Sequence, residues 1–396
     1  MTATTLEPTH RHTRTVRVDV NPQLLMWAIE RANLDAERVA KVAPKFDEWL
    51  TGDTKPTLKQ LEKFASATFT PLGYLLLDTP PDEPLPVADY RTFVGAAPAR
   101  PSPNLLDTIY ACEQRQEWYR NYALQLQFDP LEFVGSATVG ADVAAVAETI
   151  RETLDFEVET RAQYPSWTAA LSGLAEHAEA AGILVMINGV VGANTHRKLD
   201  PKEFRGFSLV DDLAPVVFVN GADTKAAQIF TLAHEIAHIW LGESGVSNAT
   251  VADNFADGVE RWCNRVAAEL LVPRAAFSQE TFDPSDLTAE LERLAKKYRV
   301  STLVILMLLR DVGRLSVQEF RQAYEDELAR VMALKGAAGS GGNFYNTQPI
   351  RVSKHFARAV ITSALEGNTL HRDAFRLLGV KKMATFNELV EKLGVV

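Results

Sequence analysis

Residues 231–240 limit the fold of this chain more than any other stretch, because they hold two histidines and a glutamate in the order His-Glu-x-x-His. In an α-helix, residues four apart lie one turn apart on the same side of the axis. His234 and His238 can therefore reach one metal ion, and the carboxylate of Glu235 lies beside it, where it can take a proton from an attacking water. The other side of the predicted helix is apolar and anchors it in a core. Its residues are Ile229, Leu232, Ile236, Ile239 and Trp240.

A pair of histidines at this spacing also occurs on the polar face of ordinary surface helices. In this chain the pair follows a strand-like run at 216–219, and Asp223 or Thr224 can cap the helix that comes next. This context favours a metal site over a solvated face.

A zinc site that keeps one position open for a reaction needs a third protein ligand. The next predicted helix, residues 258–272, carries Glu260 and Asn264 on a face separate from its apolar side. We therefore expect Glu260 to be the third ligand, with Asn264 orienting a ligand or the substrate. Cys263 falls toward the apolar side of the same helix. The alternatives that stay open for the third ligand are Asp253, Asp257 and Cys263.

These two motifs together resemble those of the ImmA/IrrE family of zinc metallopeptidases. That family pairs His-Glu-x-x-His with a downstream helix of the form E-x-x-A/C-N-x-F/V-A that ends in Leu-Leu-x-Pro, as residues 260–273 do. The resemblance implies that His234, His238 and Glu260 bind Zn²⁺ and that Glu235 is the general base. It also implies a narrow protein substrate, a transcriptional repressor or antitoxin, whose cleavage switches on a stress, mobile-element or defence operon.

Composition and charge exclude several other classes of protein. With 46% hydrophobic and 23% charged residues, the chain has the composition of a soluble protein of two to four domains. Its two cysteines, Cys112 and Cys263, exclude a disulfide framework and favour a cytoplasmic location. The sequence has no apolar run of the ~20 residues that a transmembrane span needs, so we expect no membrane contact. With a net charge of −10, the surface as a whole repels nucleic acid, so any contact with nucleic acid would need a local basic patch.

The order of predicted elements indicates an α+β fold. We expect a small zincin-like catalytic domain, consisting of a short twisted sheet and the metal-binding helix, embedded in mostly helical flanking domains. Within the linker, residues 89–93 are expected to pin the chain to the catalytic domain. The predicted parts are a disordered tail (1–16), a helix-turn-helix-like domain (17–77), a proline-rich linker (78–103), a helical connector (104–165), the zinc peptidase domain (166–273), a helix-turn-helix-like helical domain (274–335), a glycine-rich hinge (336–342) and a C-terminal helical domain (343–396).

The N-terminal part resembles a repressor-type helix-turn-helix domain through a W-x-x-G-x-x-x-P-T-x-x-x-L pattern at residues 49–61. The stretch just before Trp49 is about four residues shorter than in that family of domains. The missing residues are those at which the recognition helix would begin. Basic and acidic residues are also balanced in this part, which leaves no uncompensated positive charge for phosphates. We therefore favour docking or dimerisation over DNA reading, and a homodimer and a nucleic-acid contact both stay open.

The alternative function is a DNA-binding transcriptional regulator in which the zinc site is inactive or structural. A structural zinc site is closed by four protein ligands, and we find no convincing fourth ligand in the sequence. A second helix-turn-helix-like pair of helices follows the peptidase domain, and its second helix, residues 302–309, is almost wholly apolar. A helix that reads a DNA groove needs polar side chains to reach the base edges. We expect that helix to be buried support.

Overall fold

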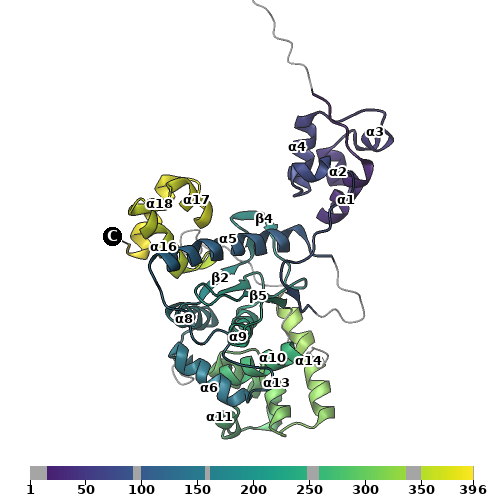
Figure 1. Cartoon of the computed structure of the whole chain (residues 1–396). Coiled ribbons are helices and arrows are strands. Elements are labelled where there is room, and N and C mark those ends of the chain that lie inside the picture. The colour runs from purple at the N-terminus through teal and green to yellow at the C-terminus, as the bar shows by residue number, and fades with distance from the viewer. Residues whose placement is uncertain (1–15, 92–99, 157–160, 248–257, 336–348, 396) are drawn as a thin grey trace, which may run out of the picture. The chain divides into compact units, whose positions relative to one another are not determined.

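The computed structural model describes residues 16–91, 100–156, 161–247, 258–335 and 349–395 (Figure 1). The chain forms two compact units. The first unit comprises Met1–Pro84 and Arg100–Leu106, and the second comprises Leu85–Ala99 and Asp107–Val396. Three sequence predictions fall outside the described residues: the disordered tail except for its last residue, the glycine-rich hinge, and the rival ligands Asp253 and Asp257. The finer domain boundaries stay predictions.

Short helices with polar N-terminal caps form the first unit. The side chains of Asn21, Asp35 and Thr57 each accept a hydrogen bond from a backbone N–H at a helix start, as good capping residues do. Trp27, Trp49 and other buried apolar side chains fill the small core between the helices. The helices are α1 (Pro22–Ala32), α2 (Ala36–Val42), α3 (Phe46–Thr51), α4 (Leu58–Ala67) and the 3₁₀ helix η1 (Leu72–Leu76).

A mixed five-stranded sheet lies at the centre of the described part of the second unit. Its strand order is β1-β7-β5-β6-β2. β1 runs parallel to β7 and β2 parallel to β6, whereas β5 is antiparallel to both of its neighbours. The strands are β1 (Ala88–Asp89), β2 (Leu184–Asn188), β5 (Gly206–Leu209), β6 (Val216–Asn220) and β7 (Gly245–Ser247); β3 (Val190–Val191) and β4 (Asn194–Lys198) form a separate hairpin.

Helices cover this sheet and surround helix α9, which carries the His-Glu-x-x-His motif and contacts β5, β6, α8 and α10 (Figure 1). This arrangement confirms the predicted α+β fold with a zincin-like centre. The strand-like run at 216–219 predicted β6, whereas no sequence pattern predicted β1 or β7. The helices are α5 (Pro103–Gln125), α6 (Val143–Leu154), α8 (Trp167–Ala180), α9 (Lys225–Leu241), α10 (Gly258–Leu271), α11 (Arg274–Ser278), η2 (Pro284–Asp286), α12 (Leu287–Tyr298), α13 (Thr302–Asp311), α14 (Val317–Lys335), α16 (Lys354–Leu365), α17 (His371–Leu378) and α18 (Met383–Leu393).

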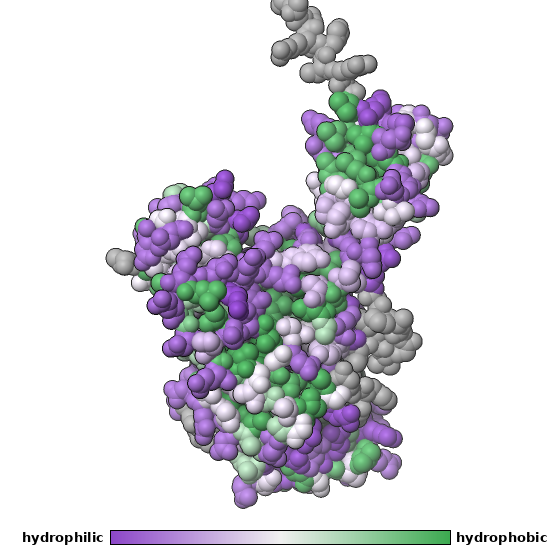
Figure 2. All heavy atoms as spheres, viewed as in Figure 1, coloured by the Kyte–Doolittle hydropathy of each residue, from purple (hydrophilic) through white to green (hydrophobic). Residues whose placement is uncertain are grey.

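The helices after α10 belong to the same unit as the sheet. Helix α13 is buried through Val304, Ile305 and neighbouring apolar residues, which confirms that it is a support helix. The carboxylate of Glu179 on α8 accepts the backbone N–H of Lys354 at 2.8 Å and so holds the start of α16. Hydrophilic side chains cover much of the face shown in Figure 2, including the C-terminal helices. Among the described residues, no helix is long and apolar enough to cross a membrane.

Candidate metal centre

Helix α9 carries the His-Glu-x-x-His motif through the interior of the second unit. It begins after Thr224, whose hydroxyl accepts the backbone N–H of Ala227 at 3.3 Å, and it ends at Gly242 in the left-handed conformation. Every residue from Gln228 to Trp240 is buried. The two histidines therefore do not belong to a solvated helix face, and the surface-helix interpretation of the motif is wrong.

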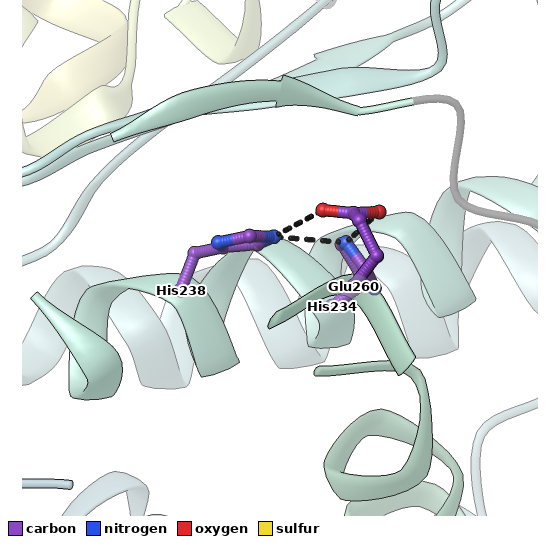
Figure 3. Close-up of side chains that lie close together, drawn as sticks. All are labelled: His234, His238 and Glu260. Carbon is purple, nitrogen blue, oxygen red and sulfur yellow. Dashed lines mark hydrogen bonds and ion pairs between the residues drawn. The ribbon is translucent and has the colours of Figure 1, made fainter. Parts of the chain in front are cut away.

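The structure brings His234, His238 and Glu260 together (Figure 3). The Nε2 atoms of the two imidazoles lie 3.1 Å apart. The Oε1 atom of Glu260, on α10, lies 2.9 Å from Nε2 of His238, and its Oε2 atom lies 3.3 Å from Nε2 of His234. Cys263 is instead packed in the apolar core. The carboxamide oxygen of Asn264 is buried and has no hydrogen-bond partner in the described residues, so its orienting role stays a prediction.

These separations test whether a metal ion fits the group. Zinc–nitrogen and zinc–oxygen bonds of roughly 2.0–2.1 Å in a tetrahedron place two ligand atoms about 3.3 Å apart. The two imidazole nitrogens lie 3.1 Å apart, and they lie 2.9 and 3.3 Å from the two oxygens of Glu260, so each spacing is close to that value. Two imidazole nitrogens and one carboxylate oxygen are also donors that zinc accepts. The three residues therefore fit a metal ion, and their chemistry fits zinc.

The electrostatics of Glu260 agree with a ligand role. Burial by itself raises the pKa of this carboxyl group, but the neighbouring imidazoles of His234 and His238 outweigh burial and lower the pKa to about 2. A carboxylate must be ionised to bind a metal ion. Glu260 is therefore in the required form across the physiological pH range.

Glu235 lies beside the group, between α9 and the sheet. Its Oε1 atom accepts a hydrogen bond from the hydroxyl of Ser247 on β7, whereas its Oε2 atom has no partner among the described residues. Burial raises the pKa of Glu235 to about 8, although His238 and the Ser247 hydroxyl act in the opposite direction. One oxygen is thus fixed and the other has no partner among the described residues, and the raised pKa makes the ionised carboxylate a stronger proton acceptor, as a general base needs.

Sequence reasoning missed Ser247, Gly206 and Tyr90 at this centre. A Cβ atom on Gly206 would lie 2.8 Å from Oε1 of Glu235, so this glycine on β5 lets the carboxylate approach the sheet. An isolated glycine in a strand-like run is a recognisable signal for such an approach. Ser247 lies in β7, a strand of three residues, and Tyr90 directly follows β1, a strand of two. Strands this short show no periodicity by which the sequence could reveal them.

Comparisons with known proteins agree with this geometry. The family profile described as IrrE N-terminal-like domain matches residues 178–310, and a second profile, a domain of unknown function (DUF8813), matches residues 352–392. The radiation response metalloprotease IrrE of Deinococcus radiodurans is 35% identical over 101 residues, which cover 24% of this chain and 30% of that protein. The chain thus spans less than a third of that relative's length, and no solved structure matches it. Residues 178–310 therefore carry an IrrE N-terminal-like metallopeptidase domain, and the buried His-His-Glu group lies within it.

Proposed function

We propose that the chain is a zinc-dependent endopeptidase that cleaves one specific protein partner, a helix-turn-helix repressor or an antitoxin, and so derepresses a stress, mobile-element or defence operon. The observation that carries the peptidase part is the buried group of His234, His238 and Glu260 with Glu235 beside it. The resemblance to the ImmA/IrrE family supports the class of substrate. The name of the similar protein, a radiation response metalloprotease, supports a role in stress.

The residues divide the chemistry between them. His234, His238 and Glu260 supply three protein ligands, the number that a catalytic zinc site uses when it keeps one position open. Zn²⁺, when bound, polarises the scissile carbonyl and makes water more acidic. Glu235 takes the proton of the attacking water at Oε2 and gives it to the leaving amine. The hydroxyl of Ser247 keeps the other oxygen of Glu235 engaged, so the carboxylate has one orientation for this transfer.

The alternative, a DNA-binding regulator with a structural zinc site, has less support. The metal-binding group found within the described ranges has three members, whereas a structural zinc site is closed by four. A structural site also has no use for a buried carboxylate with an unpaired oxygen, as Glu235 has in the described residues. In the first unit, the cations of Arg31, Lys45 and Lys55 are paired with carboxylates and are poorly placed to hold phosphates.

The test is to express the chain together with the regulator encoded in the same operon and to look for a cut in that regulator. Glu235→Gln should keep zinc and the fold but slow the cut by roughly 10²–10⁴-fold, because only the proton acceptor is lost. The same variant should capture the uncut regulator in a pull-down. Glu132→Gln, at an exposed glutamate, is the matched control and should cut normally. If Glu235→Gln relieves repression in cells as well as the unmodified chain does, the output depends on binding and the peptidase proposal fails.

A further inference from the structure

The linker reaches the metal centre through residues 88–91. β1 adds to the outer edge of β7, and the backbone N–H of Tyr90 donates to the carbonyl oxygen of Val246 at 3.0 Å. β7 also supplies Ser247, the hydrogen-bond donor to Glu235. A segment that lies far before the catalytic motif in the sequence therefore belongs to the same sheet edge as a residue of the centre.

The ring of Tyr90 contacts both the sheet and a proposed metal ligand. It stacks on the imidazole of His238, with ring centroids 5.6 Å apart and ring planes 24° apart. Gly245 also lies against the ring, because an added Cβ atom there would lie 2.3 Å from two of the ring carbons. The hydroxyl of Tyr90 donates to Oε2 of Glu243 at 2.7 Å. The ring thus fills a space that only glycine at position 245 leaves open.

The residue after Tyr90 anchors the segment. Arg91 is 5% exposed, and its guanidinium makes two hydrogen bonds to the carboxylate of Asp89, at 2.8 and 2.7 Å. Glu203 lies 3.6 Å from the same guanidinium. A forked contact between arginine and carboxylate fixes both groups in one geometry. Tyr90 is therefore fixed by backbone pairing before it and by a buried ion pair after it.

His238 lacks the contact that usually orients a metal-binding histidine. Such histidines donate their second ring N–H to a carboxylate, a carbonyl or a water, which fixes the ring and tunes the ligand. In the described part of the chain, Nδ1 of His238 has no hydrogen-bond partner. The flat contact with the ring of Tyr90 can hold the plane of this imidazole instead.

We propose that Tyr90 is a positioning residue of the metal centre: packed against Gly245 and stacked on His238, it fixes the imidazole for metal binding, so that residues 88–91 complete the site. This inference rests on the proposed role of His238 as a zinc ligand. It assigns the effect to the aromatic ring, because the ring is the part of Tyr90 that touches the imidazole. The hydroxyl, which bonds to Glu243, should matter much less.

The test measures zinc affinity of the full-length protein by competition with a chelator. Tyr90→Leu should weaken zinc binding by about 10–100-fold, the usual cost of losing a residue that orients a ligand. Tyr90→Phe should keep normal affinity because it keeps the ring. Gly245→Ala should resemble Tyr90→Leu, since the new methyl group displaces the ring while leaving Tyr90 in the sequence. Tyr110→Ala, at a 41% exposed tyrosine on α5, is the control.

Two further measurements separate positioning from a role in the fold. In Tyr90→Leu the Tm of the zinc-loaded protein should fall while the Tm of the metal-free protein stays unchanged, because only metal binding is weakened. The visible spectrum of the Co²⁺-substituted protein should change in Tyr90→Leu and Gly245→Ala and stay normal in Tyr90→Phe.

Three results would overturn the inference: normal zinc affinity in Tyr90→Leu, an equal loss in Tyr90→Phe, or an equal fall of both Tm values, including failure of Tyr90→Leu to fold. If the unmodified chain binds no zinc, the proposed function itself fails. If the unmodified chain binds zinc and Tyr90→Leu leaves the zinc affinity unchanged, only this inference fails.

Discussion

Gly206→Ala should disturb the general base while leaving all three proposed metal ligands in place. A Cβ atom at position 206 would lie 2.6 Å from Cγ2 of Thr231, 2.8 Å from Oε1 of Glu235 and 2.9 Å from the carbonyl oxygen of Phe218. The last of these belongs to the backbone of the neighbouring strand β6, so it cannot rotate away. The new methyl group must therefore push β5 and α9 apart or displace the carboxylate.

The expected cost follows from the kind of contact. Inserting a methyl group into a packed core destabilises a protein by about 1–3 kcal/mol, which should appear as a lower denaturation midpoint in urea. A displaced Glu235 carboxylate should also slow cleavage of the partner, by up to roughly the 10²–10⁴-fold that a general base contributes. Zinc content should stay normal, because the three atoms nearest to the new methyl group belong to Thr231, Glu235 and Phe218 and not to a proposed metal ligand.

Two further variants sharpen this experiment. Gly140→Ala is the control, since a Cβ atom there meets nothing within 4 Å, and it should change stability by no more than about 0.5 kcal/mol. Thr231→Ser removes the methyl group nearest to the new one, so adding it to Gly206→Ala should restore part of the lost stability. Normal stability and normal cleavage in Gly206→Ala would show that the carboxylate does not lie against the strand, and the inferred position of Glu235 would be refuted.

Three further predictions follow from the same structure. The purified protein should hold about one zinc per chain, and Glu260→Ala should lower the zinc-to-protein ratio in atomic absorption; full occupancy would place the third ligand elsewhere. The intact chain should bind duplex DNA no more tightly than a nonspecific Kd of roughly 10⁻⁴–10⁻⁶ M in fluorescence anisotropy, and nanomolar, sequence-selective binding would restore the repressor interpretation. Burial raises the pKa of Glu179 from 4.5 to about 7. As the pH rises, the folded chain therefore keeps this proton to a higher pH than the unfolded chain does. The free energy of unfolding should thus fall by on the order of 3 kcal/mol as the pH rises from 4.5 to 7. Glu179→Gln should remove that fall in urea titrations, and an unchanged pH profile would contradict the prediction.

The part of the site that the sequence predicted is the part carried by helices. His234 and His238 are four residues apart on one helix, and Glu260 lies on the separate polar side of the next, so helical geometry alone restricts which of them can meet. The distances of 2.9–3.3 Å between their side-chain atoms show that the three residues meet, and their roles as ligands stay a prediction. The buried strands β2 and β6 were also predictable, because each is a run of apolar residues of strand length.

The sheet edge beside the metal group was not predictable, for a physical reason. Alternation of side chains needs four or more residues to be recognised, whereas β7 has three and β1 has two. β1 also lies in a proline-rich stretch whose composition indicates a linker. The sequence did single out residues 89–93 as a segment that pins the linker. The pairing of Asp89 with β7 and the hydrogen bond from Tyr90 to Val246 confirm that contact, whereas residues 92 and 93 lie outside the described residues.

The short edge strands still have a large effect on the chemistry, because they supply the residues that orient the motif. The His-Glu-x-x-His pattern specifies which groups are present, but it does not specify how each side chain is held. The orientation of Glu235 depends on Ser247 in β7, and the plane of His238 lies against Tyr90 beside β1. Substitutions at this edge should therefore change metal binding and proton transfer while leaving helix content nearly constant, which circular dichroism measured beside zinc affinity can separate.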